Sequence, residues 1–301
     1  MRKVLVLALL AGVLAAVAAG CGGGDDGEET GAAGTTTATA ASTCAKDQLE
    51  VVNAGQLTVG TDNPAFPPWF EGGTQQGSRW EVNDPTTGQG YESAVTYAVA
   101  RELGFTRRDV RWIVVPFAQT YKPGPKNFDL AIEQISYSPQ RAKAVDFSES
   151  YYDVNQALVA LAGTAIARAR TRDDLKQYKL GAVIGTTSYR YIVDNIEPTE
   201  DPSVYDTLND NISALNNRQI DGLVTDFPTS YYIANVQLEN GTIVGRFPTV
   251  GQQEYFGMVF EKGSSLVECV NEALQTLKQN GDLARLEQRW ITRKASAPVL
   301  R

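Results

Sequence analysis

Arg141 stands in the segment FDLAIEQISYSPQRAKAVDFSESYY (128–152), which contains no nucleophile paired with a base. The chain has no histidine, and this excludes Ser-His and Cys-His catalysis, imidazole metal ligands and the usual neutral-pH proton shuttle. A guanidinium group is a planar fork of donors that matches the geometry of a carboxylate. Arg141 is therefore a candidate for holding a carboxylate, and the alternative is a surface arginine paired with an acidic neighbour.

Four further residues have types that complement such an arginine. Thr186 and Thr187 follow a predicted strand and open a predicted helix, so their backbone N–H groups would face an anion. Asp226 ends a predicted strand, where α/β sheets present ligands, and Ser136 adds a hydroxyl. Together they offer what a free α-amino acid needs, a clamp for its carboxylate and a partner for its ammonium. The alternatives are a helix N-cap for Asp226, a cap pair for the threonines and a turn residue for Ser136.

The elements that must position these residues alternate between strands and helices. Strands are predicted at 57–61, 110–115, 128–135, 156–162, 179–184, 220–225 and 256–260, and helices at 93–103, 187–195, 206–217, from 228 and at 266–280. This alternation predicts an α/β fold with mostly parallel sheets. Two similar halves predict two lobes, with lobe 1 at 46–155 plus 252–295 and lobe 2 at 156–251.

Composition limits the partners. The chain of 301 residues is 43% hydrophobic and 21% charged, as in soluble globular proteins. Its net charge of −8 argues against nucleic acid, because binding phosphates needs a basic face. The sequence contains no cluster of metal-ligand residues, and we expect neither a metal nor another cofactor. We expect a monomer.

The N-terminus has the pattern of an export signal. A basic head, Met1 to Lys3, precedes an apolar run too short for a membrane span, and we assign 1–20 as a signal peptide. The sequence AVAAGC resembles a bacterial lipoprotein signal, although Ala18 stands where leucine is usual. That resemblance implies lipidation of Cys21, and the alternative is plain secretion. Residues 21–45 are predicted to be a disordered tether that holds the protein at the outer face of the cytoplasmic membrane, periplasmic or at the cell surface.

Three cysteines are an odd number for an exported protein. If Cys21 carries lipid, Cys44 and Cys269 remain as a possible disulfide, which an oxidising compartment permits. So long a loop gives a stabilisation of roughly 5 kcal/mol as an upper figure. The alternative is a pair of buried free thiols.

Six stretches, in this order, resemble the solute-binding proteins of amino-acid ABC transporters, the polar-amino-acid family with the two-lobed periplasmic-binding-protein type II fold. They are LTVGTD (57–62), GYESAVTYAVARELG (90–104), the segment 128–152, LGAVIGTTSYRYI (180–192), IDGLVTDFPTSYYI (220–233) and ALQTLKQNGDLARLEQRW (273–290). The resemblance covers some 230 residues. It implies a ligand cleft between lobes, a free amino acid as ligand, an ABC transporter permease as partner and no cofactor.

The resemblance also implies roles for the site residues. Arg141, Ser136, Thr186, Thr187 and Asp226 would hold the amino-acid backbone. The ligand side chain would face three further residues, which are Asp62, Phe66 and Phe117.

The pair Glu133-Gln134 departs from the small residues usual at these positions. Two carboxylates, Glu133 and Asp62, would repel an anionic ligand side chain, so our hypothesis is a cationic or polar neutral amino acid. The alternative is that Glu133 turns away and pairs with a lysine or arginine of the scaffold.

Two other functions compete with transport. A few enzymes on this fold are cyclohexadienyl dehydratases, which need a positioned general acid, and Glu133 is the candidate for it. The protein could also be a sensory ligand-binding domain that presents its closed form to a separate receptor. The absence of histidine and the predicted lipid tether favour a binding protein over an enzyme.

Overall fold

The computed structural model describes residues 44–292 and 297–301. The predicted signal peptide, Cys21 and nearly all of the predicted tether lie outside the described residues. The described residues belong to one compact unit. Within the described residues, no helix is both long enough and apolar enough to cross a membrane.

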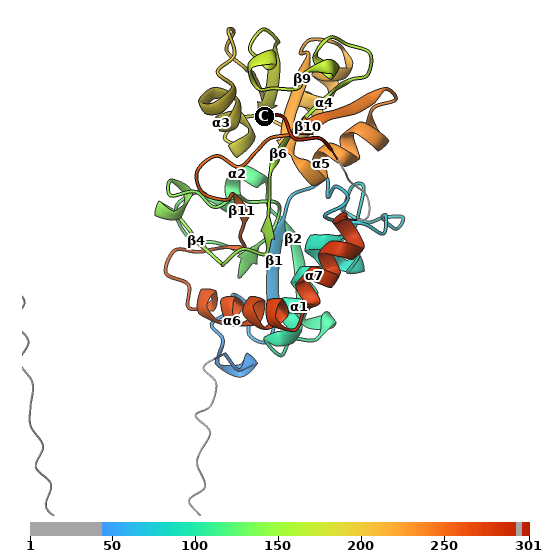
Figure 1. Ribbon diagram of the computed structural model, residues 1–301. Helices are drawn as coiled ribbons and strands as arrows, with labels where there is room; N and C mark the ends of the chain where they lie inside the picture. The colour runs from blue at the N-terminus through green and yellow to red at the C-terminus, as the bar shows by residue number, and fades with distance from the viewer. Residues whose placement is uncertain (1–43, 293–296) are drawn as a thin grey trace, which may run out of the picture. The chain divides into compact units, whose positions relative to one another are not determined.

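Two five-stranded sheets organise two lobes (Figure 1). In lobe 1 the strand order is β2 (Val110–Val114), β1 (Leu57–Thr61), β3 (Leu130–Ala131), β12 (Val259–Phe260) and β4 (Asp146–Phe147). In lobe 2 it is β10 (Gly241–Arg246), β6 (Gln156–Leu161), β9 (Gly222–Asp226), β7 (Leu180–Val183) and β8 (Ser203–Tyr205). A two-stranded sheet pairs β11 (Tyr255–Phe256) with β5 (Tyr152–Asp153). The exact lobe boundaries, 155/156 and 251/252, stay predictions.

The sheets are mixed, so the prediction of mostly parallel sheets is wrong. The pairs β1–β2, β1–β3, β7–β8 and β7–β9 are parallel, and the pairs of β6 and β12 with their neighbours are antiparallel. A parallel pair needs a crossover, usually through a helix. Strand β6 enters lobe 2 directly from lobe 1, and β12 follows β11 directly, so neither has such a crossover.

Most helices of the described residues lie close to their predicted positions, but no helix was predicted at 117–120. The described helices are α1 (Tyr91–Glu102), α2 (Phe117–Thr120), α3 (Thr187–Tyr191), α4 (Leu208–Asn216), α5 (Phe227–Tyr232), α6 (Leu266–Gln279) and α7 (Asp282–Glu287), with π-helical turns at Ile192–Ile196, Ile233–Gln237 and Gln288–Thr292. The predicted strand 128–135 is shortened to β3, and the predicted strand 256–260 splits into β11 and β12.

Amphipathic spacing explains how α6 joins the core of lobe 1. Its buried residues recur at spacings of three and one, so that they form one apolar stripe: Leu266, Cys269, Val270, Ala273, Leu274 and Leu277. Helices α1, α6 and α7 pack against one another beside the first sheet (Figure 1). In lobe 2, alternate residues of β6 belong to two clusters on opposite faces of the sheet, as strand geometry requires.

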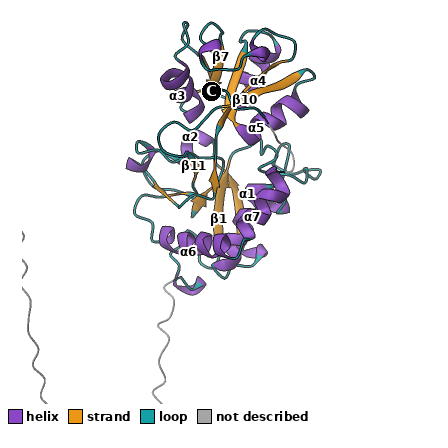
Figure 2. Ribbon diagram, in the orientation of Figure 1, coloured by secondary structure: helices purple, strands orange, loops and turns teal. Residues whose placement is uncertain are grey.

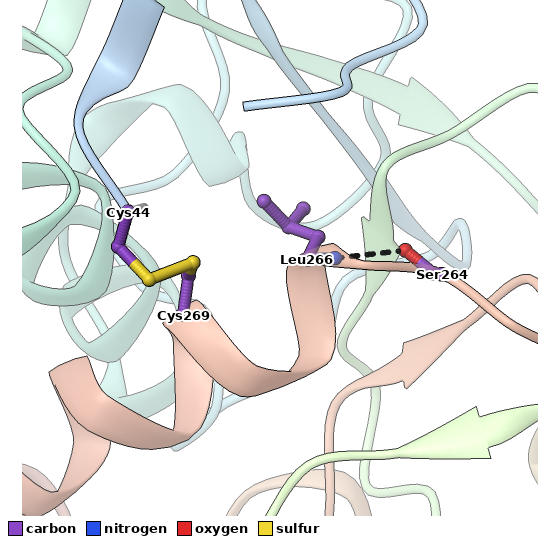
Figure 3. The surroundings of a disulfide bond; sticks show 4 residues. All are labelled: Cys44, Ser264, Leu266 and Cys269. Carbon is purple, nitrogen blue, oxygen red and sulfur yellow. Dashed lines mark hydrogen bonds between the residues drawn. A yellow bond between two sulfur atoms is a disulfide. The ribbon is translucent and has the colours of Figure 1, made fainter. Parts of the chain in front are cut away.

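Two long-range connections fix the ends of the described chain. Cys44 and Cys269 form a disulfide with a Cα–Cα distance of 5.3 Å, which confirms the predicted pair and excludes free thiols (Figure 3). Figure 3 also shows the start of α6, where the Leu266 backbone N–H donates to Ser264 Oγ at 3.3 Å. The C-terminal residues return to lobe 2, where Leu300 is buried and Val299 pairs with Arg246.

Candidate ligand-binding site

Arg141 opens a short 3-10 turn, and its side chain is only 8% exposed. Its Nη1 donates to the Ser136 carbonyl oxygen at 2.8 Å, and its Nη2 donates to the Gly185 carbonyl oxygen of lobe 2 at 3.0 Å. The guanidinium carbon lies 4.3 Å from the centre of the Tyr121 ring and 5.4 Å from that of Phe117. Burial lowers the pKa of Arg141. Arg141 forms no ion pair with any described residue, so the alternative of an exposed, paired arginine is wrong.

The two threonines behave differently. Thr186 is the N-cap of α3, because its hydroxyl accepts from the Tyr189 backbone N–H at 3.2 Å. Thr187 is the first residue of α3, and its Oγ1 lies 3.2 Å from Ser136 Oγ of lobe 1. The cap interpretation therefore holds for Thr186, while the hydroxyl of Thr187 reaches the facing lobe.

Asp226 ends β9 and caps α5. Its Oδ1 accepts from the Thr229 backbone N–H at 2.8 Å, so the N-cap interpretation is confirmed for this oxygen. Burial raises the pKa of Asp226 to about 6, because removal from water disfavours its charge, and the bonds from Thr229 oppose this only in part.

Ser136 contacts a carboxylate that sequence reasoning missed. Its Oγ donates to Glu254 Oε1 at 2.6 Å, and Gln156 Nε2 donates to the same carboxylate at 2.9 and 3.1 Å. The Gln156 amide oxygen in turn accepts from Ser188 Oγ at 2.7 Å. Two sequence signals could have indicated these residues. Glu254 stands at a predicted lobe boundary, and Gln156 is a polar residue opening an apolar strand.

The residues predicted to face the ligand side chain also link the lobes or contact one another. Asp62 accepts from the backbone N–H groups of Asn63 at 2.7 Å and Phe117 at 3.2 Å. The ring of Phe66 lies 6.2 Å from the ring of Tyr232 in lobe 2. Burial raises the pKa of Asp62 despite the two backbone bonds.

Glu133 is a buried acid without a cationic partner. This residue is only 4% exposed, and neither of its carboxylate oxygens forms a hydrogen bond of normal geometry. Burial, followed by the charges of Asp62 and Glu92, raises its pKa well above the usual value. The Asp62 backbone and the charge of Arg141 oppose these effects only in part. Glu133 forms no ion pair with a described lysine or arginine, so the alternative that it pairs with the scaffold is wrong.

Gln134 donates hydrogen bonds to Glu92, a second residue that sequence reasoning missed. Its backbone N–H donates to Glu92 Oε1 at 2.7 Å, and its amide Nε2 donates to Glu92 Oε2 at 2.5 Å. The Tyr151 hydroxyl also donates to Glu92. Burial raises the pKa of Glu92 to about 7 in spite of these three donors. Gln134 has a left-handed backbone, with φ of 53°, and Glu92 holds it there.

The arrangement brings groups from both lobes to one place. The segments between the two sheets, including α2 and β11, lie where the lobes meet (Figure 2). There a buried guanidinium, two hydroxyls and several carboxylates stand together, and the lobes touch through Arg141 and Gly185, Ser136 and Thr187, and Trp69 and Thr229. Such a set can bind a small molecule that has both an anionic and a cationic group.

Residues 57–293 match the model of the bacterial extracellular solute-binding proteins, family 3. The chain belongs to this family. The L-cystine-binding protein TcyJ of Escherichia coli (strain K12) is 26% identical over 247 residues, which cover 80% of this chain and 85% of that protein. The ABC transporter arginine-binding protein 1 of the same strain is 28% identical over 172 residues, covering 55% of this chain and 67% of that protein.

Solved structures show the same two-lobed fold. An ancestral arginine-binding protein bound to glutamine has a TM-score of 0.62 and 25% identity, over 78% of this chain and 97% of that one. The ancestral amino-acid-binding protein AncCDT-1, a precursor of cyclohexadienyl dehydratase, has a TM-score of 0.64 and 23% identity, over 79% and 96%. This family member therefore has the periplasmic-binding-protein type II fold expected from the sequence.

Proposed function

We propose that this family member captures a free amino acid between its two lobes, outside the cytoplasm, and delivers it to the permease of an ABC transporter. The observation that supports this most is Arg141, a buried cation that forms no ion pair with any described residue. A buried charge is costly unless it is paired, and a ligand carboxylate would supply the pair.

The remaining groups have matching roles in this proposal. Arg141 would exchange its two backbone carbonyls for the ligand carboxylate, and the N-terminal end of α3 with the Thr187 hydroxyl would hold the other side. Asp226 would accept from the ligand ammonium with the oxygen that does not cap α5. Because these groups come from both lobes, the ligand would favour the closed arrangement over an open one.

We propose a cationic or polar neutral side chain for the ligand. Asp62 and Glu133 bring two carboxyl groups to the region predicted to face the ligand side chain, and Glu92 lies close enough for its charge to raise the pKa of Glu133. An anionic side chain would be repelled there. The named ligands of the relatives, arginine and cystine, and the glutamine bound to the ancestral protein are compatible with this class.

Calorimetric titration of residues 41–301 with each of the twenty amino acids tests the proposal, after unfolding and refolding to remove any ligand carried through purification. We expect saturable binding of one or a few cationic or polar neutral amino acids. Arg141→Ala should abolish it, and Asp226→Asn should weaken it by about 10-fold or more, as expected for lost charge-assisted bonds. Arg108→Ala, an exposed arginine, is the matched control. Binding to none of the twenty, or tighter binding of glutamate than of arginine, lysine or glutamine, would contradict it.

We also propose that a lipid on Cys21 anchors the protein, as a monomer, to the outer face of the membrane. Cys21 lies outside the described residues, and the support is its lipoprotein-like context, AVAAGC. Fractionation of cells that express Cys21→Ser should find the protein in the soluble or secreted fraction, with the wild type in the membrane fraction. Equal distribution of the two would refute the anchor.

A second candidate function is an acid-catalysed dehydratase, and the state of Glu133 is the observation that favours it. A carboxyl group whose pKa is raised by burial is suited to be a general acid. The test is turnover of prephenate and arogenate by the wild type and by Glu133→Gln. Turnover that is lost in the variant would favour the enzyme, and absence of turnover together with amino-acid binding would favour transport.

A further inference from the structure

Glu254 lies in a segment that crosses between the lobes, after β10 of lobe 2 and directly before β11. Its backbone carbonyl accepts from the Val154 N–H at 3.0 Å, which ties it to the other crossing segment. Its carboxylate accepts hydrogen bonds from Ser136 and Gln156, both neutral donors, and it forms no ion pair with a described residue. Glu254 is therefore a carboxylate held in a fixed position by neutral donors, without an ion-pair partner among the described residues.

This position is next to the candidate ammonium site. Gln156 is directly opposite Asp226 in the antiparallel pair of β6 and β9, and directly opposed residues have Cα atoms about 5 Å apart. Ser136, the other donor to Glu254, lies 3.2 Å from Thr187 of the candidate carboxylate clamp.

The electrostatics agree with this placement. Burial is the main cause of the raised pKa of Asp226, and the charge of Glu254 adds to it. Burial is also the main cause of the lowered pKa of Arg141, which the charge of Glu254 opposes. The carboxylate thus acts on both proposed ends of the ligand.

We infer that Glu254 is a second carboxylate partner of the ligand ammonium, beside Asp226, and that Gln156 holds it in position; this rests on the proposed function. An ammonium group has three N–H donors. Asp226 already uses one of its oxygens to cap α5, which leaves it fewer acceptor sites for those donors. Glu254 provides a further acceptor and a second negative charge at the same end of the ligand.

This arrangement has a consequence for selectivity. Two carboxylates at one end of the site would make it select α-amino acids strongly over carboxylic acids that lack the amino group. Without an ammonium between them, Asp226 and Glu254, both half-buried, would repel each other.

The test pairs each amino acid with its analogue that lacks the α-amino group. Residues 41–301, as wild type and as Glu254→Gln, are titrated with L-arginine and 5-guanidinopentanoic acid, and with L-glutamine and glutaramic acid. For another ligand found among the twenty, the matching amine-free acid is used. Glu254→Asp keeps the charge but retracts it, and Glu268→Gln, an exposed acid on α6, is the control for net charge.

We expect Glu254→Gln to weaken binding of the amino acid by about 10- to 100-fold, the range for a charge-assisted hydrogen bond, and Glu254→Asp to weaken it less. Binding of the amine-free acid should be unchanged or tighter, because Glu254→Gln removes the repulsion between Asp226 and Glu254, and this binding also shows that the variant is folded. Equal losses for both probes, no loss, or tighter binding of the amino acid would overturn the inference; tighter binding would show that Glu254 competes with the ligand. If the wild type binds no amino acid, the proposed function itself fails.

Discussion

Replacing Glu133 by methionine should stabilise the protein while impairing its function. Methionine has a similar unbranched shape and no group that needs a hydrogen bond. Both oxygens of Glu133 are buried without a hydrogen bond of normal geometry, and an unsatisfied buried polar group costs about 1–3 kcal/mol. We therefore expect Glu133→Met to increase the free energy of unfolding by about 1–3 kcal/mol at pH 4, and by more at pH 8.

The pH dependence of this gain follows from the raised pKa of Glu133. In the folded protein this carboxyl group holds its proton more tightly than in the unfolded chain, whose carboxyl has the ordinary value of 4.5. Its contribution to wild-type stability is therefore most favourable below that value, and is lost as the pH rises toward the folded-state pKa. The advantage of the variant should be smallest at pH 4. It should grow by about 1.4 kcal/mol for each pH unit between the pKa of the unfolded chain and that of the folded protein.

Urea unfolding of both proteins at pH 4, 6 and 8 measures the difference, with Glu268→Met on the exposed face of α6 as the control, expected within about 0.5 kcal/mol of wild type. Titration with a cationic amino acid at pH 8 should show weaker binding by the Glu133 variant. A variant that is less stable than the wild type at pH 8, or a difference that does not change with pH, would show that Glu133 is satisfied in solution.

Three further results are expected. Replacing Cys44 and Cys269 by serine should lower the free energy of unfolding by about 2–5 kcal/mol, and adding a reductant should then have no further effect on the melting temperature; equal melting of wild type with and without reductant would contradict it. Thr229→Val removes the hydroxyl that accepts the hydrogen bond of the buried Trp69 indole N–H across the lobes. This should destabilise the closed form by about 1–3 kcal/mol, so small-angle scattering should show a larger radius of gyration for the variant than for the wild type. Leu300→Ala should cost about 2–5 kcal/mol, because this side chain is buried in lobe 2, and urea unfolding would show no change if the C-terminus were detached.

Local patterns predicted most of the longer elements and singled out residues of the candidate site, but they did not predict α2, β8 or β10. The apolar stripe of α6 has the spacing of an amphipathic helix, and the short apolar runs of β1 and β6 are typical of buried strands. Arg141 and Asp226 could be singled out because their residue types and their positions beside predicted elements indicate charge recognition. Strand direction could not be predicted in the same way, because whether β6 pairs parallel or antiparallel depends on the path of the chain and not on its residues.

The missed residues share a physical cause. In the sequence Glu92 is only a residue near the start of a helix. Its role in the site comes from its hydrogen bonds with Gln134, 42 positions later, and no local pattern predicts the left-handed backbone of Gln134. Glu254 is 118 positions from Ser136 and 98 from Gln156. Contacts between residues so far apart in the chain form only when it folds, and a single sequence does not reveal them.

The closed arrangement also limits how a ligand would enter. Arg141 already donates to Gly185 across the lobes, and Ser136 and Thr187 already face each other, so the groups proposed to bind the ligand are in use. Opening must therefore come before binding. Neutral hydrogen bonds contribute about 0.5–1.5 kcal/mol each, and bonds to charged groups about 1.5–3 kcal/mol. A ligand with two charges can thus replace these lobe contacts by stronger ones, so the same few side chains would close the empty protein weakly and the occupied protein firmly.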